Sequence, residues 1–102
     1  MKIRMWSNEI EAGLTPFVGK YIANVCLAVV ASLKTREESV SALRYDVFGE
    51  SVRVTLNGDP LPLNLNSGFV EKMIHDTIRG VIRLLKMDDP SGAIRIEINL
   101  EE

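Results

Sequence analysis

Apolar and polar residues alternate along four short stretches of the chain, and a period of two is typical of strands with one buried face. The alternation is most regular near the end of the chain, where Ile94, Ile96 and Ile98 occupy every second position. Gly49 and Glu50 separate the two middle stretches and predict a tight hairpin between them. The expected strands are residues 2–6, 43–48, 51–56 and 93–100.

Two longer stretches repeat apolar residues every three to four positions, which predicts amphipathic helices over residues 16–34 and 69–87. The first helix is expected to begin at Thr15-Pro16, because threonine accepts amide hydrogen bonds at a helix start and proline fits the first turn. Together with the strands, these helices predict a core formed by Val18, Ile22, Val25, Val29, Val54, Ile74, Ile78, Val81, Ile94, Ile96 and Ile98.

The elements follow one another as strand, helix, hairpin, helix and strand, an order that resembles the ferredoxin-like split β-α-β-β-α-β arrangement. It predicts the α+β class, with both helices on one face of a mainly antiparallel sheet. Residues 61–65 also alternate, but Pro60 and Pro62 cannot donate ladder hydrogen bonds, so a further strand there stays an open question. The 102 residues contain no obvious linker and are expected to form a single domain, residues 1–102.

Composition narrows the classes of protein to consider. Hydrophobic residues make up 46% of the chain and charged residues 25%, so we expect a folded protein rather than a disordered one. The net charge of -2 excludes a polycation but permits a local basic patch. The most apolar stretch, residues 21–33, is shorter than the ~20 residues that span a bilayer. Since no apolar leader opens the chain, we expect a cytoplasmic protein without a membrane contact.

Candidate catalytic and metal-binding groups are few. A single cysteine excludes an internal disulfide and a cysteine-rich zinc site. That residue, Cys26, falls mid-helix beside apolar positions, where nothing favours a reactive thiolate. His75 has no partner with the geometry of a catalytic pair, Asp88 and Asp89 lack the spacing of a calcium loop, and the glycines match no phosphate-binding pattern. The sequence predicts no catalytic residue, metal site or cofactor, and leaves enzyme activity uncertain.

Basic and aromatic side chains gather on one face of the sheet if the alternating apolar positions face the helices. The candidates there are Arg4, Trp6, Arg53 and Arg95, with Lys2, Arg44, Asp46, Phe48, Thr55 and Glu97 around them. Arginines and aromatics on an open sheet can clamp and stack single-stranded RNA. Cross-strand pairing between arginines and acids explains the same residues without a ligand. The second helix carries another basic ridge, suited to an acidic protein partner, at Lys72, Arg79, Arg83 and Lys86.

The first helix predicts self-association, because its outer arc is mostly uncharged and a helix that is apolar on two sides usually has two partners. Leu27 is expected at the centre of a homodimer contact, and Ala23 and Ala31 would permit close approach. The favoured function is a non-catalytic binding or regulatory module that acts through protein contacts and self-association. Two alternatives stay open: single-stranded nucleic-acid binding through the open sheet face, and a small-ligand sensor or enzyme with a site at a subunit interface.

Overall fold

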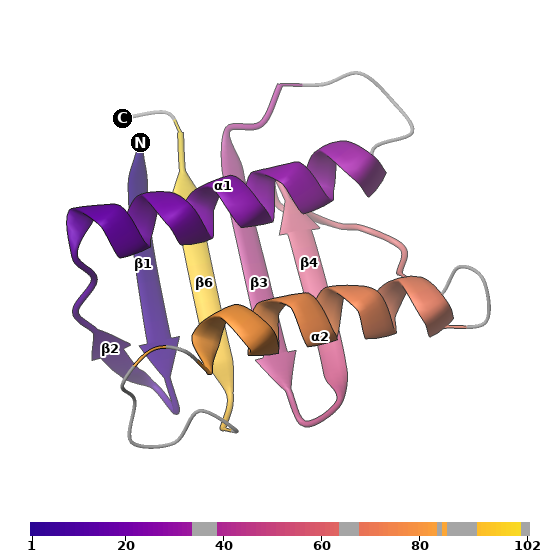
Figure 1. Ribbon diagram of the computed structural model, residues 1–102. Coiled ribbons are helices and arrows are strands. Elements are labelled where there is room, and N and C mark those ends of the chain that lie inside the picture. The colour runs from indigo at the N-terminus through magenta and orange to yellow at the C-terminus, as the bar shows by residue number, and fades with distance from the viewer. Residues whose placement is uncertain (34–38, 64–67, 84, 86–91, 101–102) are drawn as a thin grey trace.

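One antiparallel sheet of six strands and a layer of two helices make up the computed structural model (Figure 1). The structure describes residues 1–33, 39–63, 68–83, 85 and 92–100. The strands are β1 (Lys2–Ser7), β2 (Ile10–Ala12), β3 (Ala42–Phe48), β4 (Ser51–Leu56), β5 (Asp59–Pro60) and β6 (Ile94–Asn99). The helices are α1 (Pro16–Leu33) and α2 (Phe69–Ile82). This is the α+β class that the hydrophobic pattern predicts.

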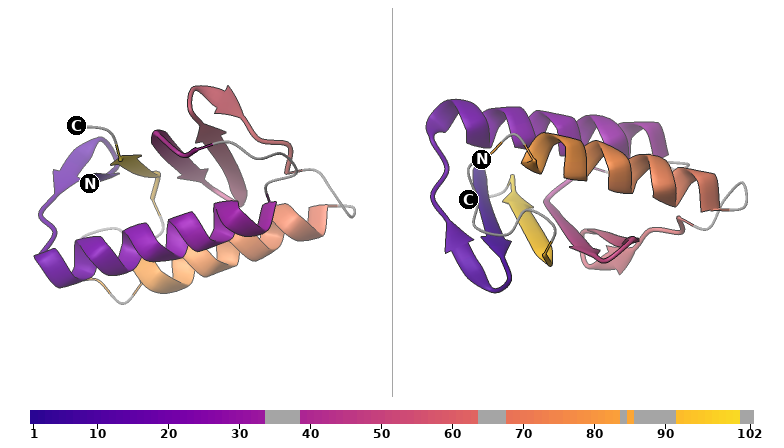
Figure 2. Two further views of the ribbon diagram at one scale, coloured as in Figure 1. Left: turned by 90° about the horizontal axis from the view of Figure 1, so that it is seen from above. Right: turned by 60° about the horizontal axis from the view of Figure 1, so that its bottom comes forward.

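The strand order is β2-β1-β6-β3-β4-β5, and every neighbouring pair is antiparallel. Helix α1 leads from the β1-β2 pair to β3, and β6 lies between β1 and β3 in the sheet. Helix α2 leads from β4 and the short β5 to β6, and β3 lies between β4 and β6. This order of the long strands is compatible with the ferredoxin-like split arrangement, which stays a prediction. Both helices cover the same face of the sheet, and they cross the strands in opposite directions (Figures 1 and 2).

The two shortest strands lie at the edges of the sheet and differ from the sequence prediction. Residues 7–14 lie between the first predicted strand and the first predicted helix, and there Asn8 and Glu9 adopt positive φ angles of 49° and 70° and fold β2 back onto β1. Positive φ is uncommon for glutamate, so residue preferences gave no signal for this turn. At the other edge, only Asp59 and Pro60 pair with β4, and residues 61–63 form no strand.

Strand alternation buries one face of the sheet as predicted. Ile94, Ile96 and Ile98 on β6 are at most 2% exposed, and the hairpin strands β3 and β4 contribute their own alternate positions to the same core. Helix α2 adds three isoleucines at helical spacing, which are Ile74, Ile78 and Ile82. Of the predicted core residues, those on the sheet and Ile22, Ile74 and Ile78 are buried, and Val81 is partly buried.

Helix α1 turns a different side toward the sheet from the one that its valines predict. Its buried residues are Gly19, Ile22, Ala23, Cys26 and Val30. The valines expected in the core are only partly buried, at Val18, Val25 and Val29. Small side chains explain the rotation, because a Cβ on Gly19 would lie 3.1 Å from Cγ2 of Ile3. The helix thus approaches β1 more closely than a larger residue would permit.

A buried hydrogen bond ties α1 to the centre of the sheet. The hydroxyl of Tyr45 on β3 donates to the backbone carbonyl of Cys26 at 2.7 Å, and both residues are 0% exposed. Burial also raises the pKa of Tyr45, so the hydroxyl keeps its proton and remains a donor. Because a buried hydroxyl without a partner costs free energy, this bond fixes where along β3 the helix can sit. By length and composition alone α1 would also suffice to cross a membrane, and 28% of it is buried here.

Replacing Ile96 with alanine tests this face assignment. The residue is 1% exposed at the centre of the core, so we expect Ile96→Ala to reduce the free energy of unfolding by about 2–5 kcal/mol in a denaturant titration. The matched control is Glu97→Ala on the opposite face of the same strand, for which we expect a change within about 0.5 kcal/mol. Equal losses from both variants would show that the two faces of β6 are wrongly assigned.

Candidate functional site

Both helices lie on one face of the sheet and leave the other uncovered (Figure 2). The strand register places two rows of mostly polar residues on the uncovered face. In the first row, neighbouring strands place side by side Trp6, Arg95, Asp46 and Arg53. In the second row, one step along the strands, the neighbours are Arg4, Glu97, Arg44 and Thr55. We call these two rows, together with Lys2 and Phe48, the outer sheet face. The register confirms that these residues lie on the side of the sheet opposite the alternating apolar residues, as predicted.

Asp46 is the hub of the polar contacts on the outer sheet face. Its carboxylate accepts a hydrogen bond from Nε of Arg44 at 2.9 Å and another from Nε of Arg95 at 3.2 Å. Its side chain is 19% exposed, whereas the two arginine side chains are 43% and 48% exposed. The acid therefore lies beneath the guanidinium groups and holds them in place. The Arg95–Asp46 pair is the cross-strand pairing that the sequence suggested as an alternative to ligand binding, whereas Arg44 and Asp46 lie on the same strand.

Trp6 lies at the β1 end of the first row beside another arginine. The guanidinium carbon of Arg4 is 4.8 Å from the centre of the Trp6 ring, which is a cation–π distance. Arg4 also makes two hydrogen bonds to the carboxylate of Glu11 on β2, at 2.8 and 3.0 Å. These bonds, together with the charge of Arg4, lower the pKa of Glu11. The short strand β2 thus orients Arg4 over the indole.

Two hollows lie along the outer sheet face. The first has a volume of about 450 Å³. Both aromatic residues of this face and three arginines line it, together with two acids, and these residues are Trp6, Phe48, Arg44, Arg53, Arg95, Glu9 and Asp46. The second, of about 570 Å³, is lined by Lys2, Arg4, Arg44, Thr55 and Glu97 among others. Arg44 lines both hollows, so they adjoin along the strand direction. Among the residues that the structure describes, this is the surface best furnished to hold an anionic ligand.

The basic ridge predicted on α2 is less available than its sequence suggests. Lys72 makes an ion pair with Asp76 at 3.3 Å. Arg79 turns back toward the sheet, where it donates to the carbonyl of Gly92 at 2.7 Å. Arg83 is exposed at the end of the helix, and Lys86 lies outside the described residues. In the part of α2 that the structure describes, acceptors within the fold therefore engage Lys72 and Arg79. Docking of an acidic partner on this ridge stays a prediction.

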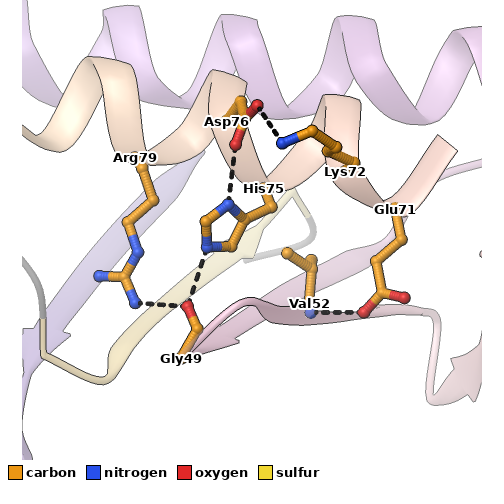
Figure 3. A network of polar contacts seen from close by, with 7 residues as sticks. All are labelled: Gly49, Val52, Glu71, Lys72, His75, Asp76 and Arg79. Carbon is orange, nitrogen blue, oxygen red and sulfur yellow. Dashed lines mark hydrogen bonds and ion pairs between the residues drawn. The ribbon is translucent and has the colours of Figure 1, made fainter. Parts of the chain in front are cut away.

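His75 bridges α2 and the turn between β3 and β4 (Figure 3). Its Nε2 is 2.9 Å from the carbonyl oxygen of Gly49, and its Nδ1 is 3.0 Å from the carboxylate of Asp76. Hydrogen bonds from His75 and Lys72 lower the pKa of Asp76, so both partners of the ring are acceptors at neutral pH. A neutral imidazole can donate to only one of them, whereas an imidazolium can donate to both.

Two further contacts complete this network (Figure 3). Arg79 donates to the same Gly49 carbonyl at 3.3 Å, and Glu71 accepts the backbone N–H of Val52 at 3.0 Å. The acceptors are the carboxylates of Glu71 and Asp76 and the backbone carbonyl of Gly49, and sequence patterns cannot reveal the last of these. Among the described residues, the ring nitrogens contact only the Gly49 carbonyl and the Asp76 carboxylate, and no group of three side chains is able to hold a metal ion. The network therefore serves to clamp the hairpin to α2.

The outer side of α1 differs in part from the one that the sequence predicts. Ala23 is 0% exposed in the core, so it cannot take part in a dimer contact, and Leu27 is partly buried against the core. Ala31 is exposed as expected. The outward positions instead include Phe17 and Tyr21, which are 76% and 52% exposed, with ring centroids 6.1 Å apart. The prediction fails for Ala23 because the small residues, rather than the valines, face the sheet.

The single cysteine is placed as the sequence predicts. Cys26 is fully buried on the core-facing side of α1, and this burial raises the pKa of its thiol to about 12. At neutral pH the thiol is therefore protonated and out of reach of solvent. A thiol in this state is a small apolar core residue rather than a nucleophile.

Comparison with known proteins adds no relative to this description. No family model matches the chain, and neither the curated proteins nor the solved structures contain a match.

Thiol labelling tests the burial of Cys26. Because the pKa is raised to about 12, little thiolate exists at pH 8, so we expect slow reaction with a maleimide in native buffer. In denaturant the same chain should react rapidly, since its thiol then has an ordinary pKa. Labelling in native buffer at the denatured rate would contradict the placement of α1.

Two arginines on α2 test the clamp. Arg79→Ala removes charged donors to the carbonyls of Gly49 and Gly92, and we expect it to lower the free energy of unfolding by about 1.5–3 kcal/mol. Arg83→Ala removes the same charge from an exposed position on the same helix, and the expected change is within about 0.5 kcal/mol. A denaturant titration in which the two variants lose equal stability would rule out a clamping role for Arg79.

Proposed function

We propose that this protein is a small non-catalytic binding module that pairs with a second copy of itself through the outer side of α1. The observation that carries the proposal is the exposure of Phe17 and Tyr21, at 76% and 52%, on the outward side of a folded domain. Two neighbouring aromatic rings in water are the kind of apolar surface that a partner normally covers.

The exposed residues of α1 are spaced as a helix-pairing seam. The outward positions are Phe17, Tyr21, Asn24, Ala28 and Ala31. They are separated by steps of four, three, four and three residues, which is the heptad spacing that keeps one line of side chains facing a partner helix. Lys20 is the only charged residue among the exposed positions of α1 between residues 16 and 33. We call these five outward positions the α1 seam.

The two ends of the α1 seam complement each other. Its N-terminal half carries the large side chains of Phe17 and Tyr21, and its C-terminal half carries Ala28 and Ala31. In an antiparallel pair related by a two-fold axis, each end of one helix meets the opposite end of the other. The aromatic rings of one copy would then pack over the alanines of the other, which favours a second copy of this chain as the occupant.

Asn24 supplies the centre of such a pair. Phe17 lies seven residues before it and Ala31 seven residues after it, so an axis at Asn24 brings Phe17 against the partner's Ala31. The same axis places Tyr21 near the partner's Ala28. A polar residue at one seam position is a known way to fix the register of paired helices, because its amide needs a polar partner. Here the amide of Asn24 would meet Asn24 of the partner subunit.

Mutation of the seam tests the proposal by light scattering over a micromolar concentration range. The wild type should be a dimer, and Tyr21→Glu should yield a folded monomer, because it brings two carboxylates into an apolar contact. Ile10→Glu is the matched control, since Ile10 is 73% exposed on β2 at the edge of the sheet. Leu27→Glu would be less informative, because Leu27 also packs against the core. A monomeric wild type, or dissociation by Ile10→Glu alone, would contradict the proposal.

Disulfide trapping tests the register. The side chain at residue 24 should face its own copy across the axis, so Asn24→Cys should form a covalent dimer under mild oxidation. Ser32→Cys is the control, because it is exposed on the same helix but eight residues from the axis. Its two copies would be about 24 Å apart along the helices and should not join. Faster trapping at residue 32 than at residue 24 would exclude this pairing.

A further inference from the structure

We propose that the outer sheet face binds single-stranded nucleic acid, with bases stacked on Trp6 and Phe48 and phosphates held by Arg53 and Arg95. This face is opposite to the α1 seam, so the inference is independent of self-association. It starts from the first hollow, where both aromatic residues and three arginines line a space of about 450 Å³. Cations and aromatic planes on one open surface are the two components with which proteins hold single strands.

Two arginines that line the first hollow have N–H groups available for a ligand. Arg95 donates to Asp46 only through Nε, so the terminal nitrogens of Arg95 have no acceptor among the residues that the structure describes. Arg53 lies opposite Asp46 in the register, yet it makes no ion pair with any residue the structure describes. A guanidinium with free terminal N–H groups matches the oxygens of a phosphate in a bidentate manner. Both groups therefore suit a polyanionic ligand.

The aromatic residues favour a nucleic acid over an acidic peptide. Phe48 is 46% exposed at the end of β3, and Trp6 lies two strands away, with Arg95 on the strand between them. The guanidinium of Arg4 lies over one side of the Trp6 indole. This cation–π contact holds the ring in place as a platform on which a base can stack. Base stacking on such rings contributes about 1–3 kcal/mol per base and tolerates any sequence. A chain of carboxylates would gain nothing comparable from these rings.

The second hollow favours a strand over a mononucleotide. It continues from Arg44 toward Lys2, so cations follow the strands from one end of the sheet to the other. A strand of six to seven residues spans about 20 Å, more than one nucleotide requires. The acids Asp46 and Glu97 are interspersed on the same track and offset part of the charge. Binding should still weaken as salt is raised, because each phosphate contact releases counterions, and stacking supplies the part that does not depend on salt.

Trp6 makes the test direct, because it is the only tryptophan in the chain. We expect an oligouridylate of about ten nucleotides, within the ~4–16 that such faces cover, to quench the tryptophan fluorescence saturably at low salt. Arg53→Gln should weaken binding about tenfold and reduce the slope of log affinity against log salt by roughly one phosphate contact. Arg83→Gln, the same charge change on α2, should bind as the wild type does.

Three results would overturn the inference. The first is an absence of saturable quenching at low salt, and the second is equal weakening by Arg53→Gln and Arg83→Gln. The third is binding of uridine monophosphate or polyglutamate as tightly as the oligonucleotide, which would indicate a small-anion or acidic-peptide site. The Tyr21→Glu variant should quench like the wild type, so a failure of self-association and a failure of nucleic-acid binding are distinguished.

Discussion

The alternation of β3 and β6 is the constraint on which the rest of the molecule depends. These two strands occupy the centre of the sheet, and every second side chain on them is almost fully buried. The intervening positions are left on a face that no helix covers (Figure 2). A slip of one residue in either strand would place an arginine in the core and the apolar residues of that strand in water, so the register is strongly determined. The hydrogen bond from Tyr45 to Cys26 then sets where α1 rests on this platform.

This division gives the protein two surfaces of different character. The helical layer presents an apolar seam with one lysine beside it, whereas the outer sheet face presents arginines held by a partly buried aspartate. Contacts through the two surfaces would not compete, because they lie on opposite sides of the domain. A pair formed through α1 would place two outer sheet faces pointing away from each other. Such an arrangement would let one dimer engage two segments of a single strand, and linked sites bind more tightly than one alone.

Much of the fold could be predicted from the sequence. The features that could not be predicted depend on close packing, on backbone groups or on strand order, which the hydrophobic pattern does not record. Strict alternation and helical spacing identify the four long strands and both helices, because burial of one face imposes those periods. The rotation of α1 was missed because a hydrophobicity pattern gives weight to valine, whereas close packing favours Gly19 and Ala23. The contacts of Arg79 were missed because backbone carbonyls carry no sequence signal. The order of the strands in the sheet also leaves no signal in the hydrophobic pattern, since a strand shows the same alternation whichever strands lie beside it.

The antiparallel pairing of α1 is tested most directly by nuclear Overhauser effects in a sample that mixes isotope-labelled and unlabelled chains. Tyr21 and Ala28 of one copy are seven residues apart, about 10 Å along the helix, too far for a strong effect between their side chains. Between two copies paired at Asn24 these side chains would be in contact. The account predicts intermolecular cross-peaks from the Tyr21 ring to the Ala28 methyl group. Intermolecular cross-peaks from Ile10 and the β2 edge instead, with none from α1, would contradict it.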